Sequence, residues 1–71
     1  MRIREQIRDL RKEAGMTQAE LASKIGTSVQ AFNNYETGKR RIPVSLLLPI
    51  KTALDCTWDE LFGEEAERED D

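Results

Sequence analysis

The stretch Thr17–Glu36, with the sequence TQAELASKIGTSVQAFNNYE, decides the fold of this 71-residue chain. Apolar residues recur in each half of the stretch at the spacing of one helix face. The side chains expected on the two inner faces are those of Leu21, Ala22, Ile25, Phe32 and Tyr35. Only Gly26 and Thr27 separate the halves, and a turn this tight does not allow antiparallel packing. The stretch therefore predicts two short helices that cross at a steep angle.

Start and stop signals bound both helices. Thr17 and Glu20 match a capping box, in which the hydroxyl accepts the N3 amide and the carboxylate reaches back to the first amide. Ser28 is a favourable N-cap for the second helix, and Gly26 can take the positive φ that the turn demands. A short supporting helix, a glycine turn and a second helix with a polar outer face form the helix-turn-helix pattern. In that pattern the second helix enters the major groove of DNA.

The flanking sequence predicts three more helices and no strand. The apolar stripe of the first helix is Ile3, Ile7, Leu10 and Ala14. The apolar face of a fourth helix, after Pro43, consists of Leu46, Leu47, Ile50, Ala53 and Leu54. Pro49 is awkward inside this helix because it lacks an amide proton and crowds the preceding turn, so we expect the helix to begin close to Ser45 or to bend. Thr57 caps a short fifth helix, which completes a compact all-α domain.

Charge is divided unevenly along the chain. Residues 1–54 carry ten basic and five acidic residues, whereas residues 55–71 carry one basic and nine acidic residues, for a net charge of -3. A basic body favours an anionic partner. Residues 64–71 contain six acids, one arginine and one alanine, which cannot form a core. We therefore expect one folded domain over residues 1–63 and an acidic, disordered tail over residues 64–71.

Composition argues against an enzyme, a cofactor site or a metal site. The chain has no histidine and a single cysteine, Cys56, so neither a zinc site of ordinary ligand count nor an internal disulfide can form. Cys56 is expected to be a small buried apolar residue. No phosphate-binding loop or nucleophile elbow is present. Without a membrane-length apolar run or a signal peptide, we expect a cytoplasmic protein with no membrane partner.

At this point the sequence resembles the lambda-repressor-like, Cro/Xre-type helix-turn-helix DNA-binding domains, over about residues 2–63. The residues that carry the resemblance are Leu10-Arg11, Gly15-Met16-Thr17-Gln18, Glu20-Leu21-Ala22, Ile25-Gly26, Phe32, Tyr35-Glu36, Gly38-Lys39-Arg40, Pro43, Ala53-Leu54 and Asp59-Glu60-Leu61-Phe62. The resemblance implies five helices and a transcriptional repressor or regulator that is often dimeric. The chain departs from the family pattern at Pro49, at Lys51, which replaces a small apolar residue, and at Asp55, where glycine is frequent.

The resemblance also implies a set of DNA contacts. The residues expected to read bases are Val29, Gln30 and Asn34. This agrees with their chemistry, because amides can pair with adenine and an apolar group can touch a thymine methyl. The residues expected at the DNA backbone are Arg11, Gln18, Ser28, Asn33, Lys39, Arg40 and Arg41. The alternative for these side chains is a merely solvated polar and basic surface.

Two further features follow from the family pattern. Arg11 and Glu36 would form a structural ion pair between the first and third helices, the alternative being two unpaired surface charges. Trp58, with Leu61 beside it, would lie at a dimer contact, the alternative being ordinary core. The expected partner is double-stranded DNA with a two-fold operator, bound by a homodimer. Two other functions stay open: an antitoxin-like module with a protein partner and secondary DNA binding, and a helix-turn-helix fold used for protein contacts alone.

Overall fold

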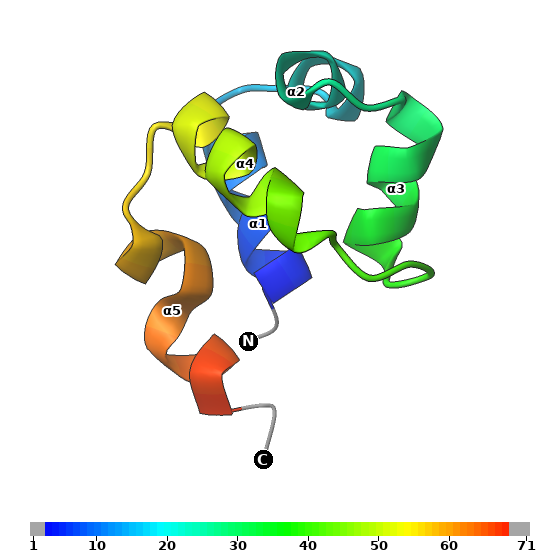
Figure 1. Cartoon of the computed structure of the whole chain (residues 1–71). Coiled ribbons are helices and arrows are strands. Elements are labelled where there is room, and N and C mark those ends of the chain that lie inside the picture. The colour runs from blue at the N-terminus through cyan, green and yellow to red at the C-terminus, as the bar shows by residue number, and fades with distance from the viewer. Residues whose placement is uncertain (1–2, 69–71) are drawn as a thin grey trace.

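Five α-helices and one short 3-10 turn make up the part of the chain that the structure describes. The computed structural model describes the backbone of residues 3–68 and the side chains of residues 3–63. The elements in chain order are α1 (Ile3–Glu13), α2 (Gln18–Ile25), α3 (Val29–Thr37), η1 (Val44–Leu46), α4 (Leu47–Leu54) and α5 (Trp58–Arg68) (Figure 1). The predicted all-α, five-helix, lambda-repressor-like fold is confirmed.

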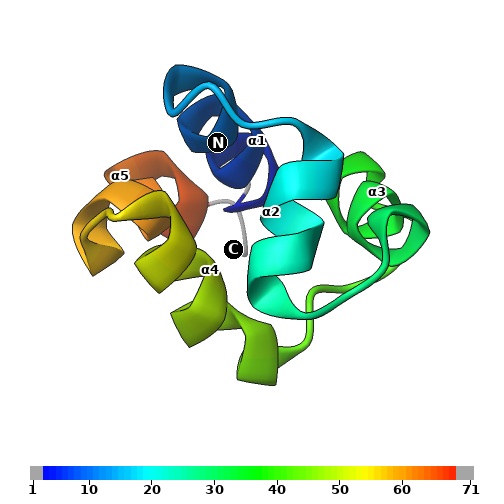
Figure 2. The same cartoon turned by 90° about the horizontal axis from the view of Figure 1, so that it is seen from above.

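Two helices, α1 and α2, hold the other three together. α1 packs against α3 and α5, whereas α2 packs against α3 and α4. Seen from above, α3 and α5 therefore lie on opposite sides of the molecule (Figure 2). Among the described helices, α1 and α2 make the main contacts with α3, and its residues Val29 and Gln30 are exposed.

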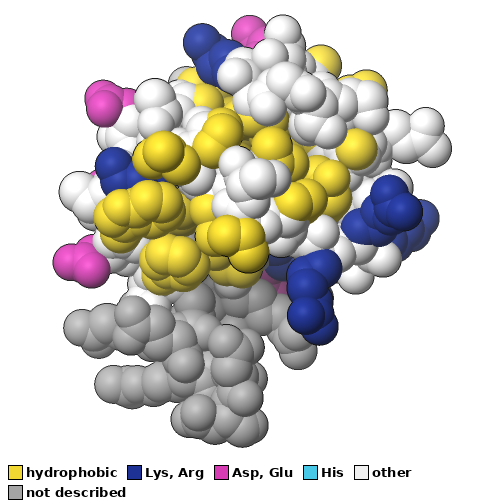
Figure 3. Space-filling model, in the orientation of Figure 1, with side chains coloured by type: hydrophobic (Ala, Val, Ile, Leu, Met, Phe, Trp, Pro, Cys, Tyr) yellow, Lys and Arg dark blue, Asp and Glu magenta, His cyan; other side chains and the backbone are white. Residues whose placement is uncertain are grey.

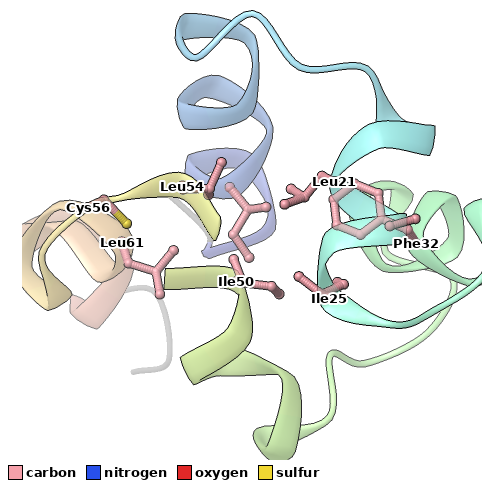
Figure 4. Close-up of a cluster of buried hydrophobic side chains, with 9 residues drawn as sticks. Leu21, Ile25, Phe32, Ile50, Leu54, Cys56 and Leu61 are labelled. Carbon is pink, nitrogen blue, oxygen red and sulfur yellow. The ribbon is translucent and has the colours of Figure 1, made fainter. Parts of the chain in front are cut away.

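The core lies where all five helices meet. Its buried side chains are Ile7, Leu21, Ala22, Ile25, Phe32, Ile50, Leu54, Cys56 and Leu61. Leu21 and Phe32 approach the core from one side and Leu61 from the other, with Ile50 between them (Figure 4). In so small a domain nearly every apolar helix face must contribute to one core. Ala14, predicted on the inner stripe of the first helix, is instead exposed, because α1 ends at Glu13.

Capping bonds fix the ends of α2 and α3 as the sequence predicts. The Glu20 amide donates to Thr17 Oγ1 at 3.0 Å, and the Thr17 amide donates to Glu20 Oε1 at 2.8 Å. This bond from the Thr17 amide lowers the pKa of Glu20. The carboxylate form is therefore the one that stabilises the fold, and its contribution is lost as the pH falls through the lowered pKa. Gly26 ends α2 with a φ of 78°, and Ser28 Oγ accepts the Ala31 amide at the start of α3.

The entry to α4 agrees with the expectation that the helix begins close to Ser45. Pro43 precedes the 3-10 turn η1, and α4 itself begins at Leu47, two residues after Ser45. Pro49 is consequently the third residue of α4. The first amides of a helix have no intrahelical acceptor, so proline is tolerated there without a bend.

The exit from α4 uses an aspartate where the family often has glycine. Asp55 adopts a left-handed conformation with a φ of 52° and ends the helix. Asp tolerates this conformation better than most residues because of its short polar side chain. Beyond it, α5 contains a break at Gly63, with a φ of 67° and a ψ of 153°. The side chains of residues 64–71 lie outside the described part of the chain, so the disordered tail stays a prediction.

Candidate nucleic-acid interface

The outer face of α3 is polar except for one exposed valine. Phe32 is buried and fixes which side of α3 faces the core. Val29 is 49% exposed, Gln30 is exposed and Asn34 is half-buried. We call Val29, Gln30 and Asn34 the reading face. All three predicted base-reading residues thus lie on one helix, with at least part of each side chain open to solvent.

A buried ion pair ties α1 to the end of α3. Arg11 Nε donates to Glu36 Oε2 at 2.7 Å, and Arg11 Nη2 donates to Glu36 Oε1 at 3.2 Å. Arg11 Nη1 also donates to the carbonyl oxygen of Met16 at 2.8 Å. Arg11 is 8% exposed and Glu36 is 7% exposed. The guanidinium thus directs three of its five donors into the protein.

Two amide side chains extend this pair to α2. Gln18 Nε2 donates to Glu36 Oε1 at 2.8 Å, and Asn33 Nδ2 donates to Gln18 Oε1 at 3.3 Å. Gln18 and Asn33 were expected at DNA phosphates; each still has one amide proton beyond these bonds. We call Arg11, Gln18, Asn33 and Glu36 the polar network. Sequence reasoning missed the two amide links, because amide rotamers leave no periodic signature.

A basic loop follows α3. Lys39, Arg40 and Arg41 are all exposed. The Arg40 amide donates to the carbonyl oxygen of Asn34 at 3.1 Å, so the loop folds back onto the end of α3. The space-filling view shows Lys and Arg side chains gathered on the side of the molecule where this loop lies (Figure 3). The loop thus places positive charge next to the reading face.

Apolar side chains are exposed on the α4–α5 side. Trp58 is 42% exposed, its ring lies 5.8 Å from that of Phe62, and Lys51 Nζ lies 5.4 Å from the Trp58 ring centroid. Leu48 is 60% exposed. Hydrophobic side chains form a broad area on this side in Figure 3. Leu61, predicted as a contact residue together with Trp58, is fully buried, so a partner would meet Trp58 and not Leu61.

The remaining chemistry of the described residues is sparse. Burial raises the pKa of the Cys56 thiol, and Cys56 lies in the core as expected. Among the described residues no group of three or more His, Cys, Asp or Glu side chains could hold a metal ion. No helix in this part of the chain has the length and apolar character needed to cross a membrane.

The fold and the α2–α3 geometry define a helix-turn-helix domain. The model of a helix-turn-helix family of the Cro/C1 type matches residues 7–61, and the chain belongs to this family. No solved structure gives a significant match to the chain.

Two curated relatives extend the comparison. The chain is 36% identical over 63 residues to the cryptic phage CTXphi transcriptional repressor RstR of Vibrio cholerae, covering 89% of this chain and 56% of that protein. It is 34% identical over 65 residues to the uncharacterized HTH-type transcriptional regulator YqaE of Bacillus subtilis, covering 90% of this chain and 56% of that protein. The chain thus spans little more than half the length of these relatives.

The ion pair generates a stability prediction. Glu36→Ala leaves the Arg11 guanidinium buried without its carboxylate, so we expect the free energy of unfolding to fall by about 3–5 kcal/mol. Urea unfolding measures this loss, and Glu13→Ala, an exposed acid on α1, is the control with an expected change below about 0.5 kcal/mol. A double-mutant cycle with Arg11→Ala should show strong coupling. If the losses of unfolding free energy in the two single variants add up to the loss in the double variant, the pair makes no net contribution in solution.

Proposed function

We propose that the chain is a sequence-specific DNA-binding transcriptional regulator, most simply a repressor, which reads the major groove with α3. The observation that carries the proposal is the reading face, which lies at least partly open to solvent on α3 while Phe32 is buried in the core. Val29 is the apolar member of this face, and its side chain is 49% exposed. The names of both relatives, a repressor and a regulator, support the same function. Such a protein would act in the cytoplasm, where bacterial DNA lies.

The reading face has the chemistry of direct readout. Gln30 and Asn34 can each bond N6 and N7 of an adenine, and Val29 can contact a thymine methyl. The polar network lies beside this face, because Asn33 follows Val29 by one helical turn on α3. We place Gln18 and Asn33 at the DNA-facing end of the network. Their remaining amide protons, with Ser28 at the N-terminus of α3, are suited to phosphate oxygens. Arg11 would act on the backbone mainly by holding Gln18 in place through Glu36.

The basic loop would contact phosphates of the DNA backbone on the other side of the half-site. Lys39, Arg40 and Arg41 are exposed cations at the end of the helix that enters the groove, and cations there neutralise phosphates whatever the sequence. We propose that two copies bind a two-fold operator. Trp58 is the proposed self-contact, since a half-exposed tryptophan is a suitable interface anchor.

A second candidate function is a protein-interaction module of the antitoxin-like kind, with DNA binding in a secondary role. The observation that favours it is the exposure of Val44, at 82%, and of Leu48, at 60%, on the side of the molecule formed by η1 and α4. Exposed apolar patches mark interaction surfaces. A protein partner on this side would leave the reading face free, so both functions are compatible.

The reading face predicts a loss of specificity on truncation. Gln30→Ala or Asn34→Ala should each cost about 1–3 kcal/mol on the best duplex and relax the preference at one base position. Binding titrations against the preferred duplex, selected from a random library, and against random duplex measure both effects. Equal losses on the two duplexes would contradict a base-reading role.

The basic loop predicts a change in salt dependence. Replacing Lys39, Arg40 and Arg41 together by Gln should lower the slope of log affinity against log salt by about 0.9 for each phosphate that the loop no longer neutralises. Affinity should fall equally for preferred and random duplexes. Titrations at four or more salt concentrations give the slope. An unchanged slope would remove the loop from the DNA surface.

Trp58 predicts cooperative pairing on DNA. Trp58→Ala should weaken binding to a two-fold site, whose half-sites are centred about 10–10.5 base pairs apart, far more than binding to one isolated half-site. The fold should survive, because Trp58 is largely outside the core. Sedimentation with operator DNA tests the stoichiometry. One protein per two-fold site at saturation would rule out the dimer.

A further inference from the structure

Four cations of α1 lie along one face of the helix. Arg8 follows Arg4 by four residues, and Arg11 and Lys12 follow Arg8 by three and four residues; spacings of three and four place side chains on the same side of a helix. This stripe borders a hollow of about 540 Å³ that also reaches Gln18 on α2 and Thr37 at the end of α3. The helix-turn-helix pattern does not include Arg4, Arg8 or Lys12. In the sequence, only their four-residue spacing indicates that they lie on one side of α1.

The hollow carries an excess of positive charge. Two acids, Glu5 and Glu36, also line it, so the four cations leave a net charge of +2. Glu36 is already engaged by the buried Arg11. Arg8 and Lys12 are exposed, and the contact of Arg8 with Asp9 is a long one, at 3.7 Å, on the surface. An exposed pair of this kind competes weakly with another anion.

The hollow continues the surface that is proposed to meet DNA. One end is Gln18, at the N-terminus of α2. The other end is next to Gly38, where a Cβ atom would lie 2.7 Å from Cζ of Arg4, so the Arg4 guanidinium lies against the end of α3. In helix-turn-helix complexes the helix before the recognition helix crosses the DNA backbone. The strand that crosses Gln18 would therefore pass the α1 stripe next.

The length of the stripe favours a polyanion over a small anion. Arg4 and Lys12 are eight residues apart, which corresponds to roughly 12 Å along a helix. Successive phosphates of one strand advance by about 3.4 Å along the DNA axis, so the stripe can follow more than one phosphate. Arg11 cannot take this role, because the polar network binds its guanidinium. The exposed cations beside it can.

We propose that Arg8 and Lys12, with Arg4, bind phosphates of duplex DNA outside the half-site that α3 reads. This inference rests on the proposed DNA-binding function. The contact adds affinity without sequence preference and lengthens the DNA that each copy protects.

The test compares single charge removals on two duplexes. Arg8→Gln, Lys12→Gln and the control Lys24→Gln, an exposed cation in the last turn of α2 away from the hollow, each remove one positive charge. The duplexes are a site selected by the unaltered chain, either with about six flanking base pairs or trimmed to the site itself. On the flanked duplex, Arg8→Gln and Lys12→Gln should each lower the salt slope by about 0.9 more than the control. On the trimmed duplex this difference should disappear.

The outcomes distinguish failure of the α1 contact from failure of the proposed DNA-binding function. If the unaltered chain binds the selected site but both α1 variants match Lys24→Gln, the α1 contact is overturned and the proposed function stands. If the unaltered chain shows no preference for any duplex, the proposed function itself fails. Thermal melting of the chain with added pyrophosphate tests whether the hollow binds a small anion instead of DNA. Stabilisation by pyrophosphate that Arg8→Gln abolishes, with unchanged DNA binding, would make the hollow a small-anion site and overturn the proposal.

Discussion

The buried pair of Arg11 and Glu36 is the interaction on which the arrangement of α1, α2 and α3 depends. Burying two charges costs several kcal/mol for each ion unless good geometry and further hydrogen bonds compensate. Here the Met16 carbonyl takes a third guanidinium donor, and Gln18 donates to the carboxylate. No buried side-chain polar atom among the described residues lacks a hydrogen-bond partner. The pair is therefore a fixed joint between three helices, and an apolar contact would be less directional.

By fixing the orientation of α3, the Arg11–Glu36 pair affects how precisely the helix can place its side chains against DNA bases. α3 has only nine residues, and its apolar anchor is mainly Phe32, which alone would allow small rotations of the helix. The bidentate contact at Glu36, one turn further along, removes that freedom because it demands one orientation. Base-edge hydrogen bonds need donors and acceptors placed within a few tenths of an ångström of their partners. The same carboxylate accepts a hydrogen bond from Gln18, so α3 and the N-terminus of α2 are positioned together.

The sequence predicted most of the fold because its helix ends are marked by local chemistry. Thr17, Ser28 and Gly26 bound α2 and α3 as expected, since caps depend on neighbouring residues alone. The start of the fourth helix close to Ser45 was also predicted, but its first turn as the 3-10 turn η1 was not, because a 3-10 turn has no distinct sequence signal. Which amides join the polar network could not be predicted, because this depends on how α2 and α3 cross. For the same reason, the sequence could not show that Leu61 is buried while Trp58 is 42% exposed, because this difference depends on how α5 packs against the rest of the domain.

Local charge, and not the net charge of -3, governs how such a domain meets a polyanion. The first acids of α5, Asp59 and Glu60, belong to the helix that lies opposite α3 (Figure 2). At physiological ionic strength, interactions between exposed charges are screened over about 8 Å, so these acids scarcely reduce the field at the reading face. The basic loop and the exposed cations of α1 lie on elements that pack next to or follow α3. A chain that is acidic overall can therefore still present a positive surface to DNA, and the residues that make it so are grouped around the joint between α1 and α3.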